Sequence, residues 1–287
     1  MHQDPFHTAG RWYRGNLHAH TTESDGDQPP GRAVWTYRHL GYDFLAITDH
    51  GKITVLPEEP HGLILLSGFE VSCGSYHIVG LGVREVPAGR SEAEVGQMIA
   101  DITGQQGLAL LAHPYWSGLA TDQCLAASGC VALEVYNTGC DLEIARGYSS
   151  VHWDDALSRG ATFAAVAVDD GHHAAVDHGY GWVWVRAEAP TVEAIMGALA
   201  RGCYYASCGP RIEDVTLADG VLQVRCSAVR EIAAVSRPGR GGVVRADPVQ
   251  PLTEARFELE AMRGYVRVQV TDALGRMAWS NPYRLPD

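Results

Sequence analysis

Lysine is nearly absent from this chain: Lys52 is the single example, and the other basic residues are arginines. Basic residues are also few overall, with 22 Lys and Arg against 34 Asp and Glu and a formal net charge of −12. A nucleic-acid backbone is a poor partner for such a chain, because phosphate contacts need clustered cations. A small anionic substrate is compatible with this balance, since bound cations can reverse the field inside a site.

Long apolar runs and paired cysteine motifs are missing too. No run is long enough to span a bilayer, and the polar first 15 residues lack the apolar core of a signal peptide. The seven cysteines are odd in number, irregularly spaced and without a CxxC pair, so we expect reduced, mostly buried thiols. We therefore expect a cytoplasmic protein with a small-molecule substrate and no nucleic-acid or membrane partner; a homo-oligomer is left open.

The first 210 residues alternate between apolar strands and amphipathic helices. The pattern predicts strands at 11–20, 42–50, 62–71, 77–83, 108–112, 131–136, 161–168 and 181–185. Helices are predicted at 29–41, 91–106, 121–128 and 191–201, and over part of 142–159. Such alternation is typical of an α/β domain, which we place at 1–210.

Beyond Pro210 the pattern changes to that of half-exposed strands. These are predicted at 215–217, 221–227, 231–236, 255–260 and 265–271, with no helix between them. Turns are predicted at Asp219-Gly220, Pro238-Gly239 and Gly241-Gly242. We therefore predict a small all-β, sandwich-like domain over 211–287.

Metal-capable side chains recur at the ends of the predicted strands. They are His18, His20, Asp49, His50, Glu70, His113, Asp170 and His172, with Asp25 and His77 just beyond a strand or at the start of the next. His18 and His20 face the same way on an extended strand, and the turn at Asp25 can fold back over them. Taken alone, a His after a strand is more often a solvated loop residue, and a Glu there is more often a helix-capping or surface group. Their shared placement predicts a metal site at the carboxyl ends of the strands.

In this order the motifs resemble those of the polymerase and histidinol phosphatase (PHP) family of metal-dependent phosphoesterases. They are HAHTTESDG at 18–26, TDH at 48–50, GFEV at 68–71, HP at 113–114 and DGH at 170–172. The resemblance covers about residues 11–208. Within the family, the spacing of the N-terminal motif and the appended β-domain resemble the branch that includes carbaryl-hydrolase-like proteins. The resemblance implies a distorted (β/α)7 PHP barrel with two or three divalent ions, Zn, Mn or Fe, at the strand ends.

The resemblance also implies which residues hold each ion. One ion would be surrounded by His18, His20, Glu70 and Asp170. Glu70 would bridge to a second ion, held also by His77 and His113, and a third would be held by Asp25, His50 and His172. Asp169, directly before Asp170, leaves a one-residue ambiguity. Glu70 and Asp170 would be the residues on which catalysis depends.

Further polar residues near the predicted mouth are candidates for substrate binding. They are Lys52, Arg146 and His178, followed by Asn137 and His173, while Asp49 could orient a ligand or cap its strand. Two neighbouring cations can share a hydroxide that attacks phosphorus, so we predict hydrolysis of a small-molecule phosphomonoester or phosphodiester. One alternative is a carbamate, ester or amide hydrolase with the same metal centre. The other is a non-catalytic, metal-stabilised module, which predicts a damaged ligand set.

Overall fold

The computed structural model describes residues 2–56, 62–89 and 91–286. Its first part contains the strands β1 (Arg11–Asn16), β2 (Phe44–Ile47), β3 (Ile64–Cys73), β4 (Tyr76–Leu81), β5 (Leu108–Leu111), β6 (Ala132–Asn137), β7 (Ala164–Val168), β8 (Trp182–Ala187) and β9 (Tyr204–Ser207). Its helices are α1 (Pro30–His39), η1 (Glu92–Glu94), α2 (Val95–Gly104), α3 (Thr121–Ala126), α4 (Thr138–Ile144), α5 (Ser150–Ser158) and α6 (Val192–Ala200). The predicted elements are present, with α4 and α5 in place of one helix at 142–159, and β9 was not predicted.

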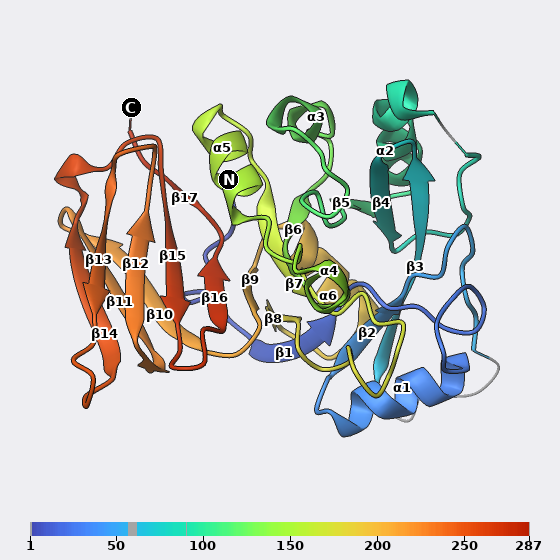
Figure 1. Cartoon of the computed structure of the whole chain (residues 1–287), viewed down its shortest axis with the longest axis horizontal. Helices are drawn as coiled ribbons and strands as arrows, with labels where there is room; N and C mark the ends of the chain where they lie inside the picture. The colour runs from blue at the N-terminus through green and yellow to red at the C-terminus, as the bar shows by residue number, and fades with distance from the viewer. Residues whose placement is uncertain (1, 57–61, 90, 287) are drawn as a thin grey trace.

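The second part is built from strands. They are β10 (Ile212–Ala218), β11 (Val221–Val229), β12 (Glu231–Val235), β13 (Gly241–Arg245), β14 (Leu252–Glu258), β15 (Tyr265–Thr271), β16 (Met277–Ser280) and β17 (Tyr283–Arg284). Two predictions were wrong here: Gly241-Gly242 opens β13 instead of forming a turn, and a single helical turn, η2 (Leu259–Ala261), follows β14. These strands stand to one side of the first part (Figure 1).

The sheets combine parallel and antiparallel pairs. The larger is 14-stranded, with the order β13-β12-β15-β16-β9-β8-β1-β2-β3-β4-β5-β6-β7 and β17 paired to β15. The smaller has the order β10-β11-β14 and packs across a buried cluster that includes Val215, Leu222 and Val268. The α/β class predicted from the sequence is confirmed, and the number of barrel strands stays a prediction.

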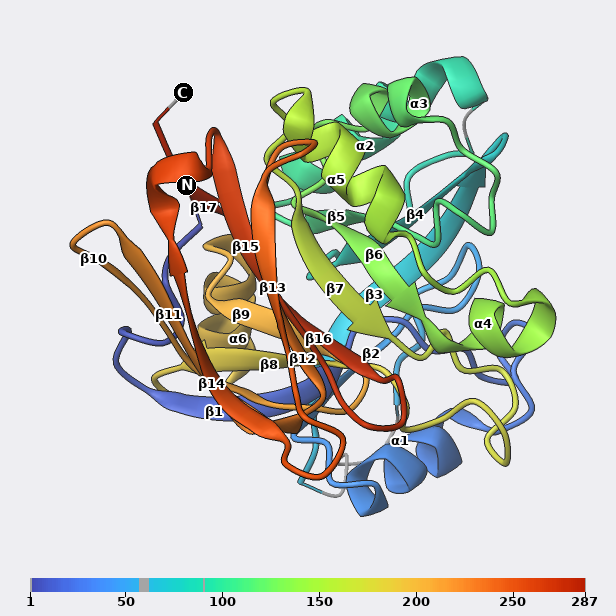
Figure 2. The same ribbon diagram turned by 60° about the vertical axis from the view of Figure 1, so that its left-hand side comes forward.

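Strand direction decides which residues meet at one rim of the first part. β1, β2 and β3 are parallel to one another, as are β5, β6 and β7. Between these two sets lies β4, antiparallel to both β3 and β5, so all of the other six strands point the same way. Their carboxyl ends therefore share a rim with the beginning of β4 (Figure 2). Because His77 is the second residue of β4, it lies at that rim.

The segments that follow β1 and β7 also meet at this rim. Ala19 and Gly171 form an isolated parallel bridge. In it, the His20 N–H donates to the Gly171 carbonyl at 3.0 Å, and the Asp170 N–H donates to the His18 carbonyl at 2.9 Å. The bridge places the first predicted metal motif directly beside the last.

The buried strands explain why the rim is held firmly. β2, β5 and β7 are buried along their whole length with the sequences FLAI, LALL and AAVAV, as expected of parallel strands covered on both faces. Phe44, Ala46 and Val166 share one buried cluster with Ile195 and Leu199 of α6. The helix thus packs against the same apolar core that supports the rim.

The larger sheet runs without a break from the first part into the second. β16 pairs with β9 in the register Ala278↔Ser207, so the domain boundary near 210 stays a prediction. All seven cysteines are buried, and no two of them form a disulfide. In the described residues, no helix has the length and apolar character needed to cross a membrane.

Candidate metal centre

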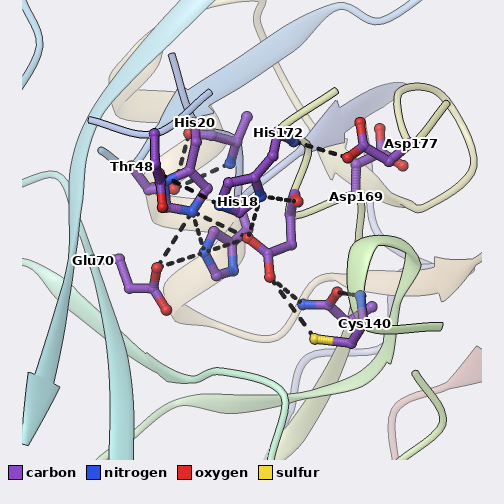
Figure 3. A network of polar contacts seen from close by, with 12 residues as sticks. His18, His20, Thr48, Glu70, Cys140, Asp169, His172 and Asp177 are labelled. Carbon is purple, nitrogen blue, oxygen red and sulfur yellow. Dashed lines mark hydrogen bonds and ion pairs between the residues drawn. The ribbon is translucent and has the colours of Figure 1, made fainter. Parts of the chain in front are cut away.

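The predicted ligands gather at the rim in three groups. In each group the ligand atoms lie within 4.8 Å of one another. The groups are His18, His20, Glu70 and Asp170; Glu70, His77 and His113; and His20, Asp25, His50 and His172. Figure 3 shows the imidazoles of His18, His20 and His172 converging with Glu70. These are the sets that the PHP resemblance implies, with His20 added to the third; that they hold metal ions stays a prediction.

Glu70 lies at the centre of the three groups. Its side chain is buried, and its Oε2 lies 3.3 Å from Nε2 of both His18 and His20 and 3.2 Å from Nδ1 of His50. Its Oε1 lies 2.8 Å from Nδ1 of His77 and 3.3 Å from Nε2 of His113. One carboxylate therefore reaches imidazoles of every group.

Asp170 and Asp169 face different surroundings. Asp170 Oδ1 lies 3.1 Å from Nε2 of both His18 and His20. The Asp169 carboxylate accepts backbone N–H groups from residues 179, 180 and 181 at 2.7, 2.9 and 2.6 Å, and burial raises the pKa of Asp169 to about 6. Asp170 is therefore the carboxylate that belongs to the cluster, and Asp169 anchors the loop before β8.

Two of the candidate ligands have strained backbones. His113 and Asp170 have φ values of 23° and 51°, in the left-handed region that residues with a side chain rarely adopt. Such conformations cost about 1–3 kcal/mol each and persist where the surrounding structure enforces them. Each lies one residue beyond the position that follows a buried strand, β5 or β7, and both side chains face the cluster.

The donor atoms fit a divalent cation. His18 donates its Nδ1–H to Glu134 Oε1 at 2.6 Å, which leaves Nε2 of a neutral ring with a lone pair. That nitrogen lies 3.1 Å from His20 Nε2 and beside carboxylate oxygens of Glu70 and Asp170. So many lone pairs converge that a metal ion or protons must separate them.

The pKa shifts within the cluster also indicate that its carboxylates favour a positive charge beside them. Burial acts to lower the pKa of His20, but Asp170 and Glu70 outweigh it and raise the pKa to about 9. Burial also acts against ionisation of Glu70, yet His18, His113 and His20 hold its pKa well below the usual value. Asp170 Oδ1 is buried and lies 3.1 Å from Nε2 of both His18 and His20, yet no contact in the described part of the chain gives it a hydrogen bond of normal geometry. A metal ion between these atoms would satisfy it.

Sequence reasoning missed Glu134 as a residue of this site. Its side chain is fully buried in β6. Besides His18, it accepts the His113 backbone N–H and the Asn137 amide, both at 2.8 Å. No motif surrounds it, and the single available signal was an acid inside an otherwise apolar strand. A fourth group, His113, Cys140 and Asp170, was also not predicted.

Asn137 and Asp49 support the site from outside the ligand groups. The Asn137 side-chain amide also donates to Asp170 Oδ2 at 3.1 Å. Its side-chain oxygen, Oδ1, accepts the Cys140 N–H at the start of α4. Asp49 accepts hydrogen bonds from Thr21 N–H and Ser24 Oγ, both at 2.7 Å. Asp49 therefore fastens the loop after β1 to the end of β2.

A pocket of about 370 Å³ opens over the candidate ligands. Beyond those ligands it is lined by Trp116, Gly139, Cys140, Glu143, His173 and Asp177. Of the residues predicted to bind substrate, His173 lines the pocket, whereas Lys52, Arg146, His178 and Asn137 do not. Lys52 pairs with Glu23, Arg146 lies 5.3 Å over the Tyr115 ring, and His178 is buried with its ring 4.8 Å from that of Tyr37.

Comparisons with known proteins identify the fold. No protein-family model and no curated protein matches the sequence. A solved two-domain protein from Bacteroides vulgatus, described as containing a predicted PHP-like metal-dependent phosphoesterase, is 13% identical; the match covers 99% of this chain and 97% of that one, with a TM-score of 0.53.

Two further solved structures resemble the chain less closely in shape. One, from Bifidobacterium adolescentis and provisionally assigned as a metal-dependent phosphoesterase, is 16% identical over 65% of this chain and 96% of its own, with a TM-score of 0.47. The other, an amidohydrolase from Chromobacterium violaceum, is 18% identical over 57% and 90%, with a TM-score of 0.42. The full-length match to the Bacteroides vulgatus protein shows that the chain has a PHP-like fold.

Proposed function

We propose that the chain is a metal-dependent phosphoesterase of the PHP family that hydrolyses a small-molecule phosphomonoester or phosphodiester at two or three divalent ions. The observation that carries the proposal is the position of Glu70, whose carboxylate reaches imidazoles of all three candidate ligand groups. The description of the Bacteroides vulgatus protein with the same fold supports it.

The arrangement suits hydrolysis. Divalent ions at such a site acidify water and neutralise charge on phosphoryl oxygens. Glu70 and Asp170 would hold the ions, and the hydrogen bond from His18 to Glu134 keeps the His18 Nε2 lone pair aimed at them. The pocket above would hold the substrate against this cluster, with Trp116 and α4 forming one wall.

A second candidate function is hydrolysis of a carbamate, ester or amide with the same residues. Among the described residues that line the pocket, none is a lysine or an arginine. A bound phosphate group would therefore depend on ions and histidines for neutralisation, while an uncharged carbonyl group brings no charge that must be neutralised on binding. This observation keeps the carbonyl reaction as the alternative.

The test is a substrate panel on protein freed of metal and then reloaded with Zn, Mn or Fe. We expect metal-dependent cleavage of p-nitrophenyl phosphate or bis(p-nitrophenyl) phosphate exceeding that of p-nitrophenyl acetate and 1-naphthyl methylcarbamate. Glu70→Ala should lose this activity together with a bound ion, whereas Glu188→Ala, at an exposed position outside the ligand groups, should keep both. Carbamate or ester cleavage alone would favour the second candidate, and full turnover by Glu70→Ala would contradict both.

A further inference from the structure

One wall of the pocket joins two segments that are far apart in the sequence. Trp116 follows β5, and its indole Nε1–H donates to Oε2 of Glu143 in α4 at 2.9 Å. The Trp116 ring also makes T-shaped contacts with the rings of His113 and His77, with centroids 5.0 and 5.8 Å apart. The aromatic and acidic side chains of this wall therefore stand beside the group formed by Glu70, His77 and His113.

The pocket is unusually acidic for a site that is expected to take phosphate. Five carboxylates line it: Asp25, Glu70, Glu143, Asp170 and Asp177. The first, second and fourth of these belong to the candidate ligand groups, where bound cations would neutralise them. No lysine or arginine among the described residues lines the pocket to offset the remainder.

The two carboxylates outside the ligand groups differ in their partners. Asp177 accepts the backbone N–H groups of His172 and His173 at 2.9–3.0 Å and is buried. Glu143 is exposed, and the hydrogen bond that the structure records for it comes from the neutral indole of Trp116. A carboxylate can accept several hydrogen bonds, so Glu143 has acceptor capacity toward the pocket beyond the bond from the indole.

We propose that Trp116 and Glu143 form a subsite for a leaving group that bears an ammonium group. The subsite rests on the proposed hydrolase function and adds the chemical class of the leaving group. An aromatic ring beside a carboxylate binds an ammonium group through cation–π attraction and an ion pair together. A leaving group with a phosphate or carboxylate of its own would meet Glu143 as a like charge at close range, which disfavours its binding.

The size of the pocket sets a limit on this leaving group. At about 370 Å³ the pocket lies near the lower end of the usual range for ligand sites, and part of it is needed for the group being cleaved. The reacting group would lie over the candidate ligands while the ammonium group reaches the Trp116–Glu143 wall. A compact amino alcohol ester fits this division, and a nucleotide with several phosphates does not.

A matched pair of substrates tests the subsite directly. Choline phosphate and 3,3-dimethylbutyl phosphate have the same shape and differ in a quaternary nitrogen against a carbon. With the metal-loaded full chain we expect kcat/KM for the choline ester to exceed that for its neutral counterpart by about tenfold or more. Glu143→Gln should bring the ratio close to one, and Glu188→Gln, which makes the same change outside the pocket lining, should keep the unsubstituted ratio.

A second variant and a second pair of esters keep this test separate from that of the phosphoesterase. Trp116→Leu should also lower the ratio, with metal content measured to show that the neighbouring histidines still hold their ions. The acetyl and carbamoyl esters of the same two alcohols repeat the comparison at a carbonyl centre. A choline preference confined to those esters would overturn the phosphoesterase and support the subsite. Equal rates within each pair, or a ratio that Glu143→Gln leaves unchanged, would overturn the subsite.

Discussion

At the scale of single residues, Glu134 shows how a side chain can shape the candidate centre without belonging to a ligand group. Its carboxylate accepts hydrogen bonds from His18 Nδ1, the His113 backbone and Asn137. It thereby fixes the ring of His18 from the first group and the strained backbone of His113 from the second. A residue in this position sets the direction of ligand atoms and the basicity of an imidazole.

Glu134→Gln should therefore weaken metal binding while the fold stays intact. The amide keeps the size of the carboxylate but removes the charge that favours a proton on His18 Nδ1. We expect about a 10–100-fold loss of affinity for at least one ion, measured by competition with a chromophoric chelator, and a changed Co²⁺ absorption spectrum. Glu188→Gln is the matched control. An unaltered affinity and spectrum in Glu134→Gln would rule out this role.

Residues with a shared placement were easier to predict than residues defined by their contacts. His18, His50, His113 and Asp170 could be singled out because each follows an apolar strand, and the structure brings them together. Glu134 lies inside a strand, where sequence spacing carries no sign of its partners. Lys52, Arg146 and His178 lie outside the pocket lining because nearby groups hold them: Glu23, the Tyr115 ring and the Tyr37 ring, respectively.

At the scale of elements, the start of β8 presses against the end of β7. A Cβ atom at Gly181 would lie 2.2 Å from the Val168 carbonyl oxygen and 2.4 Å from its carbonyl carbon. The atoms that a Cβ at Gly181 would meet belong to the Val168 backbone, so they cannot rotate out of the way as a side chain could. Val168 lies directly before Asp169 and Asp170, whose carboxylates anchor the loop and face the cluster.

Gly181→Ala should therefore destabilise the protein by about 1–3 kcal/mol, the usual cost of overpacking, and should lower metal affinity by displacing Asp170. Gly96→Ala is the control, because Gly96 lies in α2 with open space around its Cβ position; it should gain about 0.5–1 kcal/mol. Urea unfolding of both variants measures the difference. A Gly181→Ala protein as stable as the unsubstituted one would show that this contact can relax.

Elements with strong local patterns were predicted better than those that depend on distant pairing. β2, β5 and β7 are short, fully apolar runs and were recognised as strands. β9 and β16 were missed because each has only four residues and is defined by its pairing with the other. The two strands lie about 70 positions apart in the sequence, so no local pattern indicates this pairing. Gly241-Gly242 was misread because glycine signals a turn locally, while pairing with Ala234 and Val235 makes it a strand.

At the scale of the whole molecule, an ion pair joins the two parts across the continuous sheet. Arg267 in β15 is 2% exposed and donates to both carboxylate oxygens of Asp154 in α5, at 2.7 and 2.6 Å. Its guanidinium also lies 4.7 Å from the ring centre of Trp153. The pair, together with the pairing of β9 with β16, predicts that the parts unfold together.

Removing the charge of Asp154 should destabilise the protein more than removing that of Arg267. Asp154→Asn leaves a buried guanidinium without its counterion and should cost about 3 kcal/mol. Arg267→Met leaves a partly exposed carboxylate that water can solvate, so it should cost less. Denaturant unfolding followed by tryptophan fluorescence and by circular dichroism gives both values and shows whether there is one transition. An Arg267→Met protein less stable than Asp154→Asn would contradict the assignment of the cost to the buried cation.

The central claim is that histidines and acidic residues from the ends of separate strands form one binding site for divalent cations. The most direct measurement is elemental analysis of the full chain after metal removal, reloading and gel filtration, beside Glu70→Ala treated in the same way. The account predicts two or three ions per chain in the unsubstituted protein and fewer in Glu70→Ala, because that carboxylate reaches all three groups. A chain that emerges with no stoichiometric metal, or an equal load in both proteins, would contradict it.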